Sequence, residues 1–252
     1  MKKYVVSIEK ENSERLAVFF QQKIFSDPSS FKKIGIIGKN LTVSEYFDLA
    51  VAKKIRPLSP GELGCTLSHL QVYQDFLSSD AELAFVFEDD AISLLPDDID
   101  FDKLYLNITK IKLDSTFFLS LGGIQLNCAK NVYGRFIKQN ILGRNILKIH
   151  PLFVENMTST YAYVLDRKMA EVLIQYHISP RLCDQWDELV LQYPYVNFYA
   201  SYLFDHPPVL DAVTDSYLQK EREQIQLIKN KKKDYIKKYK KKLMKMVLNK
   251  YH

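Results

Sequence analysis

Short apolar runs and amphipathic stretches alternate along the first 200 residues of the chain. Apolar runs rich in β-branched and aromatic residues predict strands over residues 4–8, 34–38, 84–87, 117–121, 160–165 and 196–200, with shorter ones near 137 and 146–149. Apolar residues at helical spacing predict helices over residues 13–25, 43–54, 60–77, 101–113, 167–176 and 184–192. Strands that alternate with helices are typical of a layered α/β domain with a mostly parallel sheet.

The clearest helix start in the chain is Ser59-Pro60-Gly61-Glu62. Ser59 can cap the helix, Pro60 suits its first turn, and Glu62 completes a capping box three residues after the serine. The absence of side chains at Gly61 and Gly64 lets this first turn pack closely against a neighbouring strand or a bound nucleotide. The helix leads the chain into the next predicted strand.

Three adjacent carboxylates, Glu88, Asp89 and Asp90, directly follow that strand. Mutual repulsion and desolvation disfavour this arrangement unless a positive charge lies between them. A divalent cation that prefers oxygen ligands, Mn2+ or Mg2+, meets this need, and α/β sheets bind ligands beyond the carboxyl ends of their strands. Glu88 and Asp90 point the same way from an extended segment, which favours Asp90 as a direct ligand. The alternative is a solvated corner in which Asp89 or Asp90 only stabilises a turn.

The composition excludes several other classes of protein. With 252 residues, 47% hydrophobic content and eight glycines, the chain is neither disordered nor fibrous. Cys65, Cys128 and Cys183 form no CxxC pair, so we expect free thiols in a reducing compartment. The N-terminal apolar run is too short for a secretory signal, and no segment reaches the roughly 18 apolar residues of a spanning helix. We therefore expect a cytoplasmic protein.

The net charge of +5 hides an uneven distribution along the chain. Eleven lysines and one acid lie between Lys229 and Lys250, whereas the first 228 residues carry 24 basic and 29 acidic side chains. We predict two parts, an α/β domain over residues 1–215 and a basic amphipathic helical tail over residues 216–252.

The predicted tail has apolar residues at helical spacing, at Ile225, Ile228, Tyr235, Tyr239, Leu243 and Met246. A basic amphipathic helix of this kind can lie on an anionic membrane surface. Alternatively, the apolar stripe packs against the body of the protein. Nucleic acid is a disfavoured partner, because the body is acidic and the lysine-rich segment has no arginine.

Four stretches carry a resemblance to a known family. They are residues 58–70 (LSPGELGCTLSHL), 87–91 (FEDDA), 160–170 (TYAYVLDRKMA) and 183–186 (CDQW). Together they resemble the signatures of glycosyltransferase family 25, which includes bacterial lipooligosaccharide galactosyltransferases. The first stretch is the most specific, because thirteen contiguous positions precede the acidic motif at a set distance.

The resemblance implies a GT-A type fold and an inverting transferase whose usual donor is UDP-galactose. The acidic motif is then the counterpart of the family's Asp-x-Asp metal site, which implies Mn2+ or Mg2+ as cofactor. The implied acceptor is a saccharide or glycolipid in lipooligosaccharide synthesis. The implied location is the inner face of the bacterial inner membrane, where the basic tail would hold the enzyme as a peripheral protein.

The site residues that we expect follow from these motifs and from the chemistry. An inverting transfer needs a base for the acceptor hydroxyl, and Asp184 is the first candidate and Asp187 the second. Asp184 can alternatively cap a helix, and Trp186 can pack either on a sugar ring or in the core. We expect metal ligands at Asp90, Glu88 and His206. We expect donor contacts at Ser7, Arg15, Gly61, Glu62, Glu88, Asp89 and Trp186.

Two other functions are compatible with the sequence. A metal-dependent phosphotransferase or nuclease can use the same carboxylates, although the chain has no Gly-rich phosphate loop and no Gly-Lys-Ser/Thr motif. A catalytically inactive, membrane-associated adaptor would have the basic tail as its main feature. Binding of UDP that depends on a metal distinguishes the transferase from the phosphotransferase, and turnover distinguishes it from the adaptor.

Overall fold

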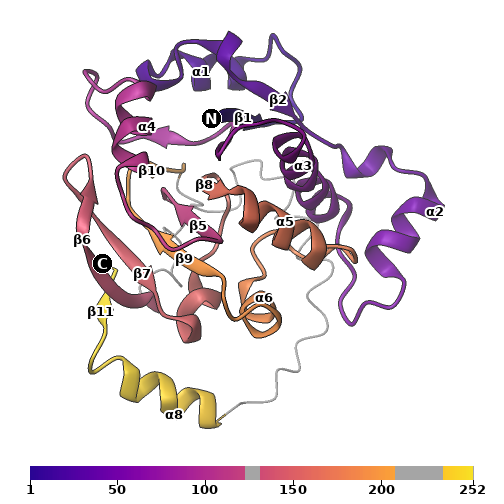
Figure 1. The fold of residues 1–252 in the computed structure, drawn as a ribbon. Helices are drawn as coiled ribbons and strands as arrows, with labels where there is room; N and C mark the ends of the chain where they lie inside the picture. Colours follow the sequence, from indigo (N-terminus) through magenta and orange to yellow (C-terminus); the bar gives the residue numbers. More distant parts are fainter. Residues whose placement is uncertain (123–130, 208–234, 252) are drawn as a thin grey trace.

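The computed structural model describes residues 1–122, 131–207 and 235–251, and its main feature is a nine-stranded sheet (Figure 1). The strands lie in the order β11-β6-β7-β9-β5-β8-β3-β1-β2. Their bounds are β1 (Lys2–Val6), β2 (Lys32–Ile34), β3 (Leu83–Glu88), β5 (Phe117–Ser120), β6 (Tyr133–Ile141), β7 (Arg144–Ile149), β8 (Ala162–Asp166), β9 (Asn197–Ala200) and β11 (Asn249–Lys250). A separate two-stranded sheet pairs β4 (Ile92–Ser93) with β10 (Phe204–Asp205).

Within the described sheet, six strands run in one direction, and β7, β8 and β11 run against them. The neighbours β2, β1 and β3 are parallel, and so are β5 and β9. Between these two groups lies β8, which pairs antiparallel with both β3 and β5. The predicted α/β fold with a mostly parallel sheet is confirmed, and the sheet is mixed.

Helices cover both faces of the sheet (Figure 1). Their bounds are α1 (Glu14–Gln21), α2 (Val43–Tyr46), α3 (Pro60–Leu77), α4 (Phe101–Thr109), α5 (Arg167–Tyr176), α6 (Trp186–Gln192) and α8 (Tyr235–Met244). Short 3-10 segments cover Lys23–Phe25, Pro28–Ser30, Gly38–Asn40 and Pro151–Asn156, and Phe47–Val51 forms a π-helical turn after α2.

Successive residues of the strands enter two separate hydrophobic clusters. On one face, Tyr4 and Val6 of β1 belong to a cluster that also contains residues of α3, α5 and α6. On the other face, Val5 belongs to a cluster with Phe19 of α1 and Leu104 of α4. Strands that alternate in this way are buried on both faces, which gives the molecule three layers, α/β/α.

The order of the strands reverses between β1 and β3. From β1 the chain crosses to β2 on one side, and α3 then returns it to β3 on the other side of β1. Open α/β sheets bind ligands at such a switch point, beyond the carboxyl ends of the strands. Ser7 follows β1 and Glu88 ends β3, so both residues lie at this point.

The capping box predicted at the start of α3 is present. Ser59 Oγ accepts a hydrogen bond from the backbone N–H of Glu62 at 3.1 Å, and Glu62 Oε2 accepts one from the backbone N–H of Ser59 at 3.0 Å. Gly64 lies so close to Gly38 that a Cβ atom would stand 2.7 Å from the Gly38 nitrogen. The absence of a side chain at Gly64 therefore allows α3 to contact the 3-10 turn that begins at Gly38.

The strand expected over residues 34–38 is wrong in its position, because β2 ends at Ile34. The chain then passes close to other backbone segments. A Cβ on Gly35 would stand 2.0 Å from the Ser7 carbonyl oxygen, and the next glycine, Gly38, begins the 3-10 turn. These close approaches take the segment out of the sheet after three residues.

The C-terminal segment packs against the body and joins its sheet at β11 (Figure 1). β11 pairs antiparallel with β6, and in α8 Lys237 Nζ lies 2.6 Å from Glu155 Oε2. Lys241 pairs with the same carboxylate. The predicted boundary between residues 215 and 216 lies outside the described residues and stays a prediction. None of the described helices is both long and apolar enough to cross a membrane.

Candidate active site

The acidic motif lies at the switch point of the sheet, where β1 and β3 end side by side. The two strands are parallel neighbours, and Val6 is the register partner of Glu88. Ser7 follows β1, and Asp89 and Asp90 follow β3. The carboxyl ends of two adjacent strands therefore bring these polar side chains to one edge of the sheet.

Asp89 is buried and is held within the protein. Ser7 Oγ donates a hydrogen bond to Asp89 Oδ2 at 2.5 Å, and Arg15 Nε donates one to Asp89 Oδ1 at 2.6 Å. Burial raises the pKa of Asp89 above its ordinary value, and the hydrogen bonds from Ser7 and Arg15 only partly offset this rise. Both carboxylate oxygens are engaged, so Asp89, held by Ser7, anchors Arg15, and the donor contacts expected at Ser7 and Asp89 stay predictions.

Asp90 has one paired and one unpaired oxygen. Its Oδ2 lies 2.8 Å from Arg15 Nη2 and 3.1 Å from His206 Nε2. Its Oδ1 is buried and has no hydrogen-bond partner in the described part of the chain. Burial acts to raise the pKa of Asp90, but the hydrogen bond and charge of His206, the charge of Arg15 and a backbone hydrogen bond together outweigh it, so the pKa lies below its ordinary value. Burial acts to lower the pKa of His206, and Asp90 raises it above the ordinary value.

Glu88 completes the acidic motif and faces α3 and β8. Thr160, just before β8, donates from Oγ1 to Glu88 Oε1 at 2.8 Å. His69 Nε2, on α3, lies 3.5 Å from the same oxygen. Asp90 and His206 are in contact, and the charge of Glu88 also contributes to the raised pKa of His206. These three residues are the ones that the sequence predicted as metal ligands.

The residues around Asp90 fit a hard divalent cation. The unpaired buried Oδ1 of Asp90 is a carboxylate oxygen, the ligand type that Mn2+ and Mg2+ prefer. His206 Nδ1 is 2.7 Å from the carbonyl oxygen of Pro207, a contact that orients the ring with Nε2 toward Asp90. A metal ligand must be a neutral imidazole, so the raised pKa of His206 means that ion binding is favoured by higher pH.

The two candidate bases lie in different elements, Asp184 in the loop before α6 and Asp187 in the first turn of that helix. Ser159 donates its backbone N–H to Asp184 Oδ2 at 3.1 Å. Asp184 directly follows Cys183, whose Sγ lies 3.5 Å from the Thr160 hydroxyl that bonds Glu88. The loop therefore brings the backbone at Asp184 close to the acidic motif.

The alternative reading of Asp184 as a helix cap is not observed, because α6 begins at Trp186 and the residue that precedes it is Gln185. The helix expected over residues 184–192 is thus shorter at its start. The Asp184 carboxylate instead accepts a hydrogen bond from the backbone N–H of Ser159 in the loop.

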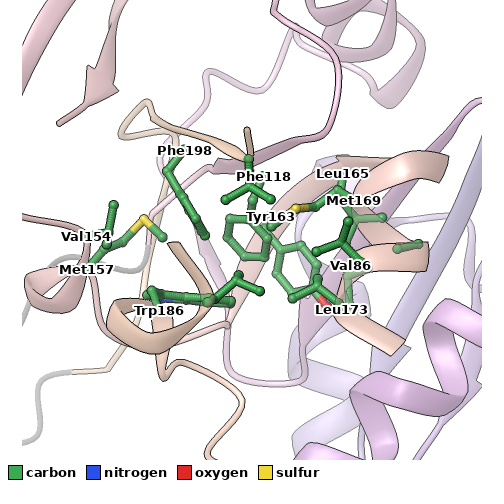
Figure 2. Packing of buried hydrophobic residues seen from close by; sticks show 14 of the residues in the cluster. Val86, Phe118, Val154, Met157, Tyr163, Leu165, Met169, Leu173, Trp186 and Phe198 are labelled. Atoms are coloured by element: carbon green, nitrogen blue, oxygen red, sulfur yellow. The ribbon is translucent and has the colours of Figure 1, made fainter. Parts of the chain in front are cut away.

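Trp186 lies in the core and not at the edge of the site. Its side chain is 1% exposed. Its ring centroid is 4.9 Å from that of Phe118 and 5.2 Å from that of Phe198, and Figure 2 shows the indole among these rings, Val154 and Met157. The predicted contact between Trp186 and a sugar is therefore wrong for this conformation. One tryptophan between Gln185 and Asp187 fits a core or a binding site equally well, so the sequence did not distinguish them.

Glu62 is also a structural residue. It is 3% exposed, and its carboxylate accepts hydrogen bonds from both terminal nitrogens of Arg56, at 2.8 and 3.1 Å. The carboxylate also accepts the capping bond from the backbone N–H of Ser59. The predicted donor contact of Glu62 is therefore wrong, and Gly61 beside it lies in the first turn of α3.

Two residues that sequence reasoning did not place in the site are Thr160 and His69. Thr160 Oγ1 lies 3.2 Å from His69 Nε2, and His69 Nδ1 is 2.7 Å from the hydroxyl of Tyr163. Thr160 is the first residue of the family-like stretch 160–170, and this was the sequence signal that pointed to it. His69 stands one helical turn after Cys65, a spacing that places both on one face of α3.

A family model described as glycosyltransferase family 25 (LPS biosynthesis protein) matches residues 1–187. Among solved structures, the crystal structure of mannose-1-phosphate geranyltransferase from Thermus thermophilus aligns at 11% identity and a TM-score of 0.38, over 81% of this chain and 76% of that one. A TM-score this low supports no argument about this chain. No match was found among curated proteins.

The burial of Trp186 is directly measurable, because the chain contains a single tryptophan. We expect blue-shifted fluorescence emission in the native protein and little quenching by iodide, since the indole has almost no contact with solvent. Trp186→Phe should lower the free energy of unfolding by about 1–2 kcal/mol, because it leaves a void beside Phe118. Iodide quenching as strong as that of the urea-unfolded chain would contradict a core position.

Proposed function

This chain belongs to glycosyltransferase family 25, and we propose that it transfers a hexose from a UDP-sugar to a saccharide acceptor with inversion at the transferred carbon. The family description refers to LPS biosynthesis. We propose galactose as the hexose, and lipooligosaccharide or another cell-surface glycolipid as the acceptor. The α/β sheet with a polar site at its switch point supports a GT-A type arrangement.

The environment of Asp90 is the observation that carries this proposal. A buried carboxylate oxygen without a hydrogen-bond partner in the described residues destabilises the folded protein unless another group binds to that oxygen. Asp90 and His206, with Glu88 beside them, would hold Mn2+ or Mg2+. When bound, such an ion supplies positive charge that neutralises the leaving diphosphate.

Arg15 provides a positive charge that belongs to the chain itself. Its guanidinium bridges Asp89 and Asp90, and its side chain is 44% exposed. Guanidinium groups bind phosphate oxygens through several N–H donors in a fixed plane. The two aspartates hold Arg15 in one orientation, so it can bind a diphosphate with little further loss of side-chain entropy.

Asp184 is the base in this proposal. An acceptor hydroxyl that attacks the sugar must lose its proton to a group on the side opposite the leaving diphosphate. The bond from the Ser159 backbone to Asp184 Oδ2 fixes the carboxylate, and the preceding residue, Cys183, approaches the Thr160 hydroxyl that bonds Glu88. Asp187 lies within α6 and is the second candidate.

The C-terminal helix α8 supports the proposal that the enzyme binds to the inner face of an anionic membrane. Lys237 and Lys241 of α8 face the body, where they pair with Glu155. Apolar residues on the opposite side of the helix and its continuation are exposed, namely Ile236, Tyr239, Leu243 and Met246. Exposed lysines flank them, at positions 238, 240 and 242. An apolar stripe between lysines is the pattern of helices that lie in a membrane interface.

The proposed membrane contact uses part of the apolar stripe that was predicted from the sequence. The structure leaves Tyr239, Leu243 and Met246 exposed, so the alternative in which this stripe packs against the body does not hold for them. Ile225 and Ile228 lie outside the described residues.

The metal site is tested with Asp90→Ala and isothermal titration of UDP with and without Mn2+. We expect wild-type protein to bind UDP in a metal-dependent manner, and Asp90→Ala to bind it at least about tenfold more weakly in Mn2+. The matched control is Asp114→Ala. It removes an exposed aspartate that pairs with Lys148 and does not belong to the acidic motif. Equal UDP affinity with and without Mn2+ in the wild-type protein would refute the metal-dependent site.

The base is tested by release of UDP from UDP-galactose in the presence of a panel of soluble saccharides. We expect Asp184→Asn to lower kcat by about 10^2- to 10^4-fold with little change in UDP affinity, because the amide cannot accept the proton. Asp187→Asn serves as the control and should retain most of the activity. If Asp187→Asn is the more damaging substitution, the assignment of the base is reversed.

The membrane surface is tested by sedimentation with vesicles that contain phosphatidylglycerol. Combined Leu243→Ser and Met246→Ser should weaken binding by at least about tenfold, because both side chains would enter the interface. The control combines Val18→Ser and Ile178→Ser, two apolar residues exposed elsewhere on the body. Binding that is unchanged in the first variant, or lost equally in both, would remove this role from α8.

A further inference from the structure

A cluster of two thiols and an imidazole lies next to the acidic motif and has no role in the proposed transfer. Cys65 and His69 come from α3, and Cys183 comes from the loop between α5 and α6. One potential ligand atom from each residue lies within 4.8 Å of the other two. In the part of the chain that the structure describes, this is the one group of three His, Cys, Asp or Glu side chains with that geometry.

The spacing of the atoms matches a tetrahedral metal site. Cys65 Sγ and Cys183 Sγ are 3.6 Å apart. Two thiolates at about 2.3 Å from one Zn2+ with tetrahedral angles lie about 3.8 Å apart, so the two sulfurs need almost no movement. Cys65 and His69 are four residues apart on a helix, the spacing at which two side chains can reach one ion.

A contact at its second ring nitrogen already orients His69. His69 Nδ1 is 2.7 Å from the hydroxyl of Tyr163, which is itself 3.1 Å from the hydroxyl of Tyr73. These contacts leave Nε2 facing Thr160 and Glu88. Metal-binding histidines usually have such a partner on the second ring nitrogen.

Glu88 lies beside the cluster and is not part of it. Its Oε1 lies 3.5 Å from His69 Nε2 and accepts a hydrogen bond from Thr160 Oγ1 at 2.8 Å. The Thr160 hydroxyl also lies 3.5 Å from Cys183 Sγ. The two thiols and the imidazole supply three of the four ligands that Zn2+ takes, and water can fill the fourth position.

The Cys65 thiol is stabilised in its protonated form. The hydrogen bond with Cys183 and then burial raise the pKa of Cys65 well above its ordinary value. Entry of Zn2+ would form two zinc–sulfur bonds and release two thiol protons to solvent. The two thiolates then balance the two positive charges, and no electron is transferred.

We propose that Cys65, His69 and Cys183 form a site for Zn2+, with water as the fourth ligand, separate from the Asp90 site. The ion would tie α3 to the loop that carries Asp184, because Cys183 directly precedes that residue. The site selects a borderline-soft cation through its sulfur ligands, whereas the Asp90 site selects a hard cation.

The test measures bound metal in the full chain without a polyhistidine tag, after equilibration with micromolar Zn2+ and gel filtration. We expect about one zinc ion per wild-type chain by elemental analysis. Cys65→Ser and Cys183→Ser should each bind zinc at least about tenfold more weakly. The control Cys128→Ser removes the third cysteine and should keep the ion, and Asp90→Ala should keep it too, which separates this site from the proposed function.

A second measurement needs no variant and therefore does not depend on the folding of the serine proteins. Wild-type protein loaded with Co2+ should show the sulfur-to-cobalt charge-transfer absorption of thiolate ligands, and added Zn2+ should abolish it. Three results would overturn the proposal: wild-type protein without zinc, zinc that is unchanged in both serine variants, or a native mass two hydrogens lower, which indicates a disulfide between the two thiols in place of a metal site.

Discussion

Three adjacent carboxylates can stand at the end of one strand only because each has its own partner. Thr160 bonds Glu88, Ser7 bonds Asp89, and His206 pairs with Asp90. Arg15 bridges the last two. Without these contacts the repulsion between neighbouring charges, added to their desolvation, would shift the pKa of at least one carboxyl far upward or unfold the strand end.

These partners come from four separate parts of the chain, and the order of the strands is what brings them together. Ser7 lies at the end of β3 because β1 and β3 are parallel neighbours. Thr160 lies there because β8 runs antiparallel to β3, so the start of β8 is next to the end of β3. The backbone N–H of Glu88 donates to the carbonyl of Tyr161 at 2.8 Å, which fixes that meeting point. The site is thus a consequence of one parallel and one antiparallel neighbour of the same strand.

Local features of the sequence predicted local structure well. The capping box at Ser59 and the aromatic run before Glu88 have a physical cause within a few residues, and both are present. Features that depend on distant partners were not predictable in the same way. Glu62 looked available for a donor, but Arg56 occupies it, and nothing in the spacing of the two residues shows that pairing.

The same limit explains Trp186 and the thiol cluster. A single aromatic residue gives no period, so its burial depends on whether Phe118 and Phe198 reach it from other strands. Cys65 and Cys183 are far apart in the sequence and share no motif spacing, yet α3 and the loop before α6 bring their sulfurs to 3.6 Å. Contacts that the tertiary fold creates are visible only once the order of the strands is known.

The orientation of α8 reverses the usual arrangement of a surface helix. An amphipathic helix normally turns its apolar stripe to the core and its charges to water. In α8 the lysines that face the body bind Glu155, and Leu243 and Met246 are 47% and 79% exposed. Pairing of β11 with β6 fixes this orientation and also covers a sheet edge. Exposure of that stripe loses the hydrophobic stabilisation that burial would give, so the stripe is best explained by an apolar partner outside the chain. Its flanking lysines select a partner with negative charge, and an anionic bilayer offers both properties in one surface.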